Sequence, residues 1–230
     1  MVRIRTIGFD ADDTLWHSEN HFQSAHAEYV NVMSDHLDAD TIEAKLLETE
    51  RKNLAVYGYG VKPFTLSMME TALEITNNKL DATHVRQILE IGQTLLQMPV
   101  ELLPDVAETI DKLGQDYELV LITKGDLKDQ ERKIEDSELA GHFAALEIVS
   151  DKTETTYQNI FNRHAGIEHS VMIGNSMKSD ILPALDAGAF AAHVPYHVTW
   201  ALEEAHSDGH DKLIIAETLS DAAQKIRLLG

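Results

Sequence analysis

The apolar residues of this chain fall into two patterns, short continuous runs and repeats with helical spacing. A short β-rich run covers residues 3–9 and ends abruptly at Asp10. Later apolar runs predict strands over 118–122, 145–150, 170–173, 191–194 and 213–215. Segments with helical spacing accompany them over 104–113, 127–139, 156–164, 179–187 and 219–228. Alternating strands and helices predict an α/β fold, with a Rossmann-like parallel sheet and helices on both faces.

The region between the first strand and the rest of these elements shows helical spacing and no convincing strand. It predicts helices over 21–36, 41–56, 63–75 and 81–96, and Asp40 and Thr41 offer an N-cap for the second. We therefore predict an all-helical insertion in a core domain. The expected boundaries are core at 1–17, helical insertion at 18–97 and core at 98–230.

Composition and charge narrow the class of protein and of partner. The 230 residues are 43% hydrophobic and 25% charged, which is ordinary for a globular chain. Nineteen Lys and Arg against 39 Asp and Glu give a net charge of −20. A surface this acidic repels polyanions, so neither nucleic acid nor an anionic membrane is an expected partner. A small phosphorylated substrate remains possible, because a bound cation can override the global field locally.

The absence of cysteine removes disulfides, thiolate nucleophiles and thiolate metal ligands together. The apolar run before Asp10 is too short for a signal peptide, and no window approaches the ~18 apolar residues of a membrane span. These features lead us to expect a soluble, cytoplasmic protein.

Polar residues with compatible chemistry follow four predicted strands. They are Asp10 and Asp12, then Thr123, then Lys152, and finally Asn175 and Asp180. Each alone is more often a loop cap, a turn residue or a solvated lysine. Because ligands of open parallel sheets bind at the carboxyl ends of strands, their joint placement predicts a functional site.

The residue types indicate the chemistry of that site. Two neighbouring carboxylates repel each other unless a cation or a shared proton relieves them. A hydroxyl and a lysine from adjacent strands suit a phosphoryl group. A further aspartate with oxygen-bearing neighbours suits Mg²⁺, which binds few carboxylates and keeps several waters.

The motifs, in this order and spacing, resemble those of the haloacid dehalogenase (HAD) superfamily, and the resemblance covers nearly the whole chain. Asp10-Ala11-Asp12-Asp13-Thr14 matches the first motif, and the apolar run ending at Thr123 matches the second. Lys152 matches the third, and Gly174-Asn175 followed by Asp180 matches the fourth. The helical insertion is similar to the C1-type cap of that superfamily. Two positions depart from the common pattern: Asp13 stands where many members have Gly, and Asn175 where many have Asp. The amide of Asn175 lowers the negative charge around a cation and could weaken metal affinity.

The resemblance implies a Mg²⁺-dependent phosphomonoesterase that acts on a small phosphorylated metabolite through an aspartyl-phosphate. Asp10 would be the nucleophile, and Asp12 the general acid and then the general base. Thr123 and Lys152 would hold the phosphoryl oxygens. Asp10, the carbonyl of Asp12 and Asp180 would hold Mg²⁺, with Asn175 as a further candidate ligand.

Several alternatives stay open. A dehalogenase expels halide, which needs no proton, so the presence of Asp12 favours the phosphatase branch. A phosphomutase or other phosphotransferase would use the same residues. A non-enzymatic phosphoacceptor, such as a response-regulator receiver, is about half this length and has no helical insertion after its first strand. A binding protein without activity fits poorly with the full set of site residues.

Three further residues are predicted to bind substrate. Lys124 follows Thr123 directly, and Trp16 lies just after the first motif. Tyr59 belongs to Tyr57-Gly58-Tyr59-Gly60, a glycine-interrupted turn that could move over a site. The equally weighted alternative is a connector between helices whose tyrosines pack on the insertion itself.

Overall fold

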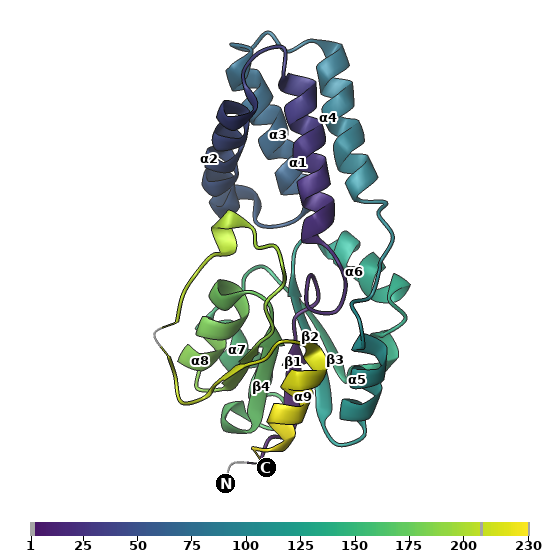
Figure 1. Cartoon of the computed structure of the whole chain (residues 1–230), viewed down its shortest axis with the longest axis vertical. Helices are drawn as coiled ribbons and strands as arrows, with labels where there is room; N and C mark the ends of the chain where they lie inside the picture. Colours follow the sequence, from purple (N-terminus) through teal and green to yellow (C-terminus); the bar gives the residue numbers. More distant parts are fainter. Residues whose placement is uncertain (1–2, 208, 230) are drawn as a thin grey trace. The chain divides into compact units, whose positions relative to one another are not determined.

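A parallel β-sheet organises the core of the protein. The computed structural model describes residues 3–207 and 209–229. Within them six parallel strands form one sheet in the order β3-β2-β1-β4-β5-β6 (Figure 1). The strands are β1 Thr6–Phe9, β2 Glu118–Lys124, β3 Ala145–Val149, β4 Ser170–Gly174, β5 Phe190–His193 and β6 Leu213–Ile215. The predicted parallel α/β fold is therefore confirmed.

The first strand lies inside the sheet, between β2 and β4. Phe9 lies opposite Leu121 of β2 and Ile173 of β4 in the parallel register. Because parallel strands end at the same edge, the segments that follow β3, β2, β1 and β4 are neighbours. These four segments carry the candidate site residues.

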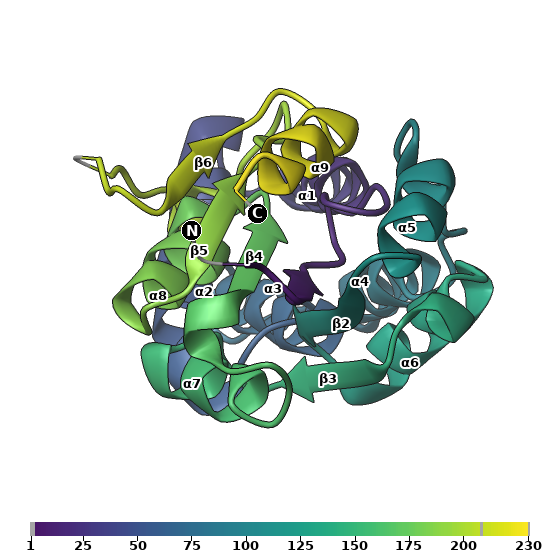
Figure 2. The ribbon, with the colours of Figure 1, turned by 90° about the horizontal axis from the view of Figure 1, so that it is seen from below.

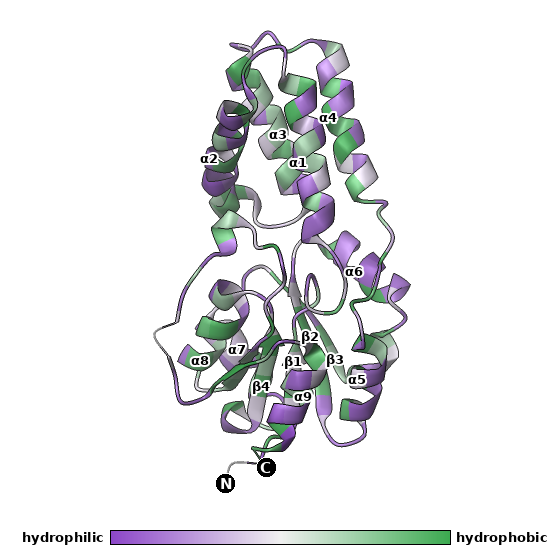
Figure 3. Cartoon of the chain, viewed as in Figure 1, coloured by the Kyte–Doolittle hydropathy of each residue, from purple (hydrophilic) through white to green (hydrophobic). Residues whose placement is uncertain are grey.

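Helices cover both faces of the sheet, as Figure 2 shows. On one face, side chains such as Ile7 and Phe9 pack with α5 (Val106–Gly114), α6 (Leu127–Asp136) and α9 (Leu219–Arg227). On the other face, Val120 and Met172 pack with α7 (Glu154–Phe161) and α8 (Leu182–Asp186). This alternation follows from the two-residue period of a strand. In Figure 3 the strands are coloured mostly as hydrophobic residues, and the flanking helices carry both hydrophobic and hydrophilic residues.

Several helices begin or end two or three residues from the predicted positions, and the two that follow β2 and β4 show why. The helix expected over 127–139 ends at Asp136, and Glu138 then adopts a left-handed φ of 59°. The helix expected over 179–187 is a π-helical turn, Met177–Ile181, followed by the short α8. Pro183 lies in the first turn of α8, where its missing N–H costs little.

Four helices form a second compact unit. Contacts divide the chain into one unit of residues 1–19, 100–124 and 130–230 and another of residues 20–99 and 125–129. The second unit holds α1 Glu19–Met33, α2 Ala39–Tyr57, α3 Val61–Ile75 and α4 Ala82–Leu95, and it has an apolar core of its own. Asp38, rather than Asp40 or Thr41, caps α2 by accepting from the Thr41 amide. None of the helices in the described ranges is both long and apolar enough to span a membrane.

Candidate active site

A buried lysine joins two of the predicted site aspartates. The Lys152 ammonium donates to Asp10 Oδ1 at 2.5 Å and to Asp180 Oδ1 at 2.7 Å, and only 1% of the lysine side chain is exposed. Asp10 follows β1, Lys152 follows β3, and Asp180 comes from the turn after β4. The residues matched to the first, third and fourth motifs are therefore in direct contact.

The electrostatics of this group are dominated by burial. Burial raises the pKa of Asp10 to about 7, and the charge of Asp180 adds to that rise against the opposing effect of Lys152. Burial alone would lower the pKa of Lys152, but the two carboxylates hold it above its usual range. One lysine thus only partly offsets two buried carboxylates, so additional positive charge would be favourable here.

Gly174 allows Asp180 to approach the end of β4. A Cβ at position 174 would lie 2.3 Å from Asp180 Oδ2, which is far inside van der Waals contact. The same carboxylate oxygen accepts from the Ser176 amide at 2.9 Å. The glycine of the fourth motif is therefore a steric requirement for the aspartate that follows it.

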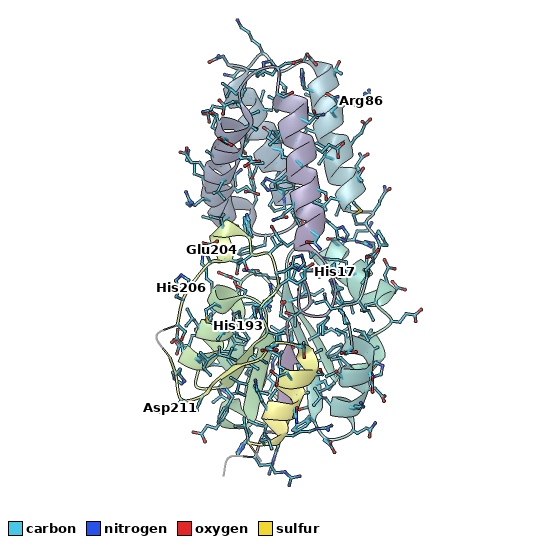
Figure 4. The ribbon with its side chains drawn as sticks, viewed as in Figure 1. His17, Arg86, His193, Glu204, His206 and Asp211 are labelled. Carbon is cyan, nitrogen blue, oxygen red and sulfur yellow. The ribbon has the colours of Figure 1, made fainter. Side chains whose placement is uncertain are left out.

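Thr14 connects the nucleophile candidate to Asn175. Its hydroxyl lies 2.9 Å from Asp10 Oδ2 and 3.2 Å from Asn175 Oδ1, and it accepts from the backbone N–H of Asn175 at 3.1 Å. The carbonyl oxygen of Asn175 lies 2.9 Å from Nε2 of His193, which Figure 4 labels at the end of β5. These contacts of the Asn175 backbone, together with the contact of its side-chain Oδ1 with Thr14, hold the side chain of Asn175 near Asp10.

The oxygen atoms gathered here fit a magnesium ion. Among the described residues no cluster of three or more His, Asp or Glu side chains has the arrangement of a metal site. Mg²⁺ needs no such cluster, since it binds through one or two carboxylates, other oxygens and water. Asp10, Asp180, the Asn175 amide and the Asp12 carbonyl are the candidate ligands, and the raised pKa of Asp10 is consistent with a site that favours added positive charge.

Asp12 has an environment of its own, distinct from that of Asp10. Its carboxylate accepts from Trp16 Nε1 at 2.7 Å, from Gln130 Nε2 at 2.9 Å and from Lys133 Nζ at 2.7 and 2.8 Å. Burial would raise the pKa of Asp12, but the charge of Lys133 and these hydrogen bonds lower it below its usual value. The lowered pKa favours the ionised form of Asp12, which is the form that can accept a proton.

Gln130 and Lys133 were not identified by the sequence analysis. Both lie on α6, one turn apart, directly after the strand that carries Thr123. Gln130 Nε2 also lies 2.9 Å from the hydroxyl of Thr123, which is almost fully buried. The available signal was the spacing Gln-x-x-Lys, which puts both side chains on one face of a helix that starts next to the site.

Two residues predicted to bind substrate have other contacts. Trp16 is 1% exposed and belongs to the hydrophobic core. Its indole N–H donates a hydrogen bond to Asp12. Lys124 donates to Ser179 Oγ and to Glu203 Oε1, each at 2.7 Å. Glu203, which the sequence analysis missed, also accepts from Ser176 Oγ at 2.5 Å. The substrate-binding role of both residues stays a prediction, and the structure adds that their polar atoms also hold Asp12, Ser179 and Glu203.

Tyr59 lies in the turn between α2 and α3, as predicted. The neighbouring Tyr57 donates from its hydroxyl to Glu70 Oε1 at 3.0 Å, within the same helical unit. Tyr57 therefore follows the alternative interpretation, in which the turn packs on its own unit. The substrate contact of Tyr59 stays a prediction.

The backbone conformation and hydrogen bonds of Asp13 explain why an aspartate can stand where the common motif has glycine. Its φ of 64° lies in the left-handed region, where glycine is usual and aspartate is among the tolerated residues. Its carboxylate accepts from the amides of Ser18 and Glu19 at 2.9 and 3.0 Å, at the start of α1. Burial, with the nearby charge of Asp12, raises the pKa of Asp13 to about 7. Asp13 thus caps a helix while it maintains the backbone turn.

Comparison with known families agrees with this geometry. The family model described as "haloacid dehalogenase-like hydrolase" matches residues 4–188, a span that contains all the motif residues above. The chain belongs to this family. It is a haloacid dehalogenase-like hydrolase with a parallel six-stranded core.

Individual relatives of this hydrolase differ in how similar they are. N-acylneuraminate-9-phosphatase of Rattus norvegicus is 24% identical over 205 residues, which cover 82% of this chain and 81% of the relative. A crystal structure of a haloacid dehalogenase-like family hydrolase from Xanthomonas campestris is 39% identical, with a TM-score of 0.88 over 98% of this chain and 91% of that one. A HAD-hydrolase structure from Bacillus subtilis, bound to magnesium, shares the fold at 18% identity and a TM-score of 0.67, over 97% and 99% of the two chains.

Proposed function

We propose that this hydrolase is a Mg²⁺-dependent phosphomonoesterase that acts on a small phosphorylated metabolite through an aspartyl-phosphate. The observation that carries the proposal is that Asp10 and Asp12, only two residues apart in the sequence, have carboxylates in separate environments. Asp10 faces Lys152 and Asp180, whereas Asp12 is held by its own set of donors. The similarity to a phosphatase at 24% identity supports the same reaction.

In the first step, a carboxylate oxygen of Asp10 attacks phosphorus and the bond between phosphorus and the leaving oxygen breaks. Asp12 must carry a proton in this step, although its donors favour the ionised form, and it gives that proton to the leaving oxygen so that an alcohol leaves instead of an alkoxide. Lys152 and Thr123 hold the phosphoryl oxygens. Mg²⁺, bound by the oxygens named above, would offset the repulsion between the nucleophile and the phosphate.

In the second step, water attacks the aspartyl-phosphate and Asp12 takes the proton of that water. The bond between Asp10 and phosphorus breaks, which releases inorganic phosphate and restores the carboxylate. Both protons pass through the same side chain, so Asp12 ends the cycle in the state in which it began.

Asp12 also favours this proposal over dehalogenation. L-2-haloacid dehalogenases are among the solved structures with this fold. Halide leaves without a proton, so an enzyme that expels it gains nothing from a general acid beside the nucleophile. Phosphotransfer to a second substrate uses the same residues as hydrolysis and is distinguished by the fate of the phosphate.

The proposal is tested with the purified chain and a panel of phosphomonoesters that includes an aryl phosphate. We expect release of inorganic phosphate with Mg²⁺, loss of that release after chelation with EDTA, and its return when Mg²⁺ is restored. Release of chloride from a 2-chloroacid, or activity that persists without any divalent cation, would contradict the proposal. Phosphate that appears on an added alcohol instead of in solution would indicate a phosphotransferase.

We further propose that the helical unit is a cap domain that sets substrate preference, because the core residues all act on the phosphoryl group and none selects the leaving group. Tyr59→Ala is then expected to change the order of substrates by kcat/KM and to leave Mg²⁺ dependence intact. The matched control is Tyr57→Ala at the end of α2, because the Tyr57 hydroxyl already contacts Glu70. One common factor of change across all substrates would show that Tyr59 does not determine specificity.

A further inference from the structure

The carboxylate of Asp12 is surrounded by more donors than a general acid–base needs. Oδ1 accepts from Trp16 Nε1 and Lys133 Nζ, and Oδ2 accepts from Gln130 Nε2 and Lys133 Nζ. A carboxylate offers about four lone-pair positions, so these four contacts occupy all of them. Asp12 can act on a leaving oxygen or a water only after one of its donors gives way.

Gln130 is one of the fixed donors. It is 2% exposed, and its Nε2 lies 2.9 Å from Asp12 Oδ2, 2.9 Å from the Thr123 hydroxyl and 2.8 Å from the Lys124 carbonyl oxygen. Exchange of its amide oxygen and nitrogen would put an acceptor against a carboxylate, so the chemistry of these neighbours sets the orientation. Gln130 therefore connects the general acid–base to the buried hydroxyl near the end of β2.

Lys133 differs from the other donors in kind. Trp16 is packed in the core and Gln130 has three acceptors, but Lys133 reaches Asp12 through a flexible chain and its side chain is 13% exposed. Its ammonium contacts both carboxylate oxygens, which fixes the plane of the carboxylate as well as its position. Lys133 thus acts on the orientation of both carboxylate oxygens, whereas Trp16 and Gln130 each hold one of them.

We propose that Gln130 and Lys133 are positioning residues for Asp12, which orient its carboxylate for proton transfer to the leaving oxygen and from water. The chemical role rests on the function proposed above, whereas the orientation rests on the contacts themselves. A displaced general acid transfers its proton poorly, and a misplacement of about 1 Å can cost ~10²-fold in rate. Oxygens that leave readily without a proton are little affected by such a displacement.

The kinetic test compares Lys133→Met with Lys128→Met, the same substitution at an exposed lysine of the same helix. For Lys133→Met we expect single-turnover phosphorylation of Asp10 by an alkyl phosphate to fall ~10–100-fold and that by an aryl phosphate less than ~3-fold. KM should change little, and Lys128→Met should match the wild type. Gln130→Met, which is uncharged and similar in length, should show the same pattern. Equal losses for both classes of substrate would overturn the proposal.

A second measurement does not depend on activity. The chain has two tryptophans, so the indole N–H signal of Trp16 can be assigned in a ¹⁵N spectrum with a Trp200→Phe variant. Because that N–H donates to Asp12, Lys133→Met should shift the Trp16 signal and leave that of Trp200 in place, and Lys128→Met should move neither. An unmoved Trp16 signal would overturn the positioning role. A moved signal in a chain that hydrolyses no phosphomonoester would refute the proposed function and leave the orientation of Asp12 by Lys133 supported.

Discussion

Asp10→Asn is expected to reduce turnover of every phosphomonoester by several orders of magnitude. The substitution replaces the attacking carboxylate oxygen with a neutral amide and keeps the size of the side chain. Since the attack forms the covalent intermediate, no other residue of the site can take over this step. The measurement is the rate of phosphate release together with a search for phosphoprotein by mass spectrometry, and both should be lost.

The fold should survive this change. The pKa of Asp10 is about 7 in the folded protein, against an ordinary value of 3.8, so the folded state favours the neutral form of this side chain. As the pH rises above 3.8, keeping Asp10 in the folded protein therefore lowers the stability of the fold. A neutral asparagine removes that cost, and Lys152 keeps its contact with Asp180. The thermal midpoint at neutral pH should therefore not fall. Near wild-type turnover, in a sample whose substitution is verified by mass spectrometry, would refute the nucleophilic role.

Asp12→Asn is expected to lower turnover by ~10²–10⁴-fold, the usual contribution of a general acid–base. The amide that replaces the carboxyl group has no ionisable proton to give to the leaving oxygen, and it cannot take one from water. In the first step an aryl phosphate should lose much less than an alkyl phosphate, because a phenolate leaves more readily than an alkoxide.

The measurement is single-turnover formation of the aspartyl-phosphate with both kinds of substrate, alongside Mg²⁺ affinity by calorimetry. The backbone carbonyl of residue 12 is unchanged, so Mg²⁺ affinity should stay close to that of the wild type. A control variant, Lys128→Met, accounts for any general effect of a surface change near α6. The assigned role of Asp12 fails if phosphorylation slows by the same factor for both leaving groups.

The strands that place the candidate site were predicted well. The carboxyl ends of β1 and β4 lie within one residue of the prediction, and β2 continues two residues past the predicted Ile122. Short apolar runs bounded by polar residues are a strong local signal in a parallel sheet, because such strands are buried on both faces. The carboxyl ends of parallel strands lie at one edge of the sheet, so the site residues could be placed together at that edge without knowledge of the strand order.

The supporting contacts could not be predicted because they join distant parts of the chain. Gln130 and Lys133 look like the polar face of a solvated helix, and only the packing of α6 brings them to Asp12. Glu203 reaches Lys124 from a short 3₁₀ turn after β5 that has no marked sequence pattern. The core packing of Trp16 was likewise not predictable, because a large aromatic residue next to a motif fits either a binding site or a hydrophobic core.

The internal position of β1 has a consequence for the order in which the protein can be made. Thr6 pairs with Glu118 on one side and with Ser170 on the other, so the strand that ends at Asp10 has no partner until long after it leaves the ribosome. The helical unit is encoded almost wholly within residues 20–99 and has a core of its own, so its chain is complete much earlier. Pairings of such large sequence separation form slowly, since loop closure must precede them. The edge that carries the candidate site can therefore assemble only after β4 has been synthesised, and a chain cut short before β4 lacks the segment with Asn175 and Asp180.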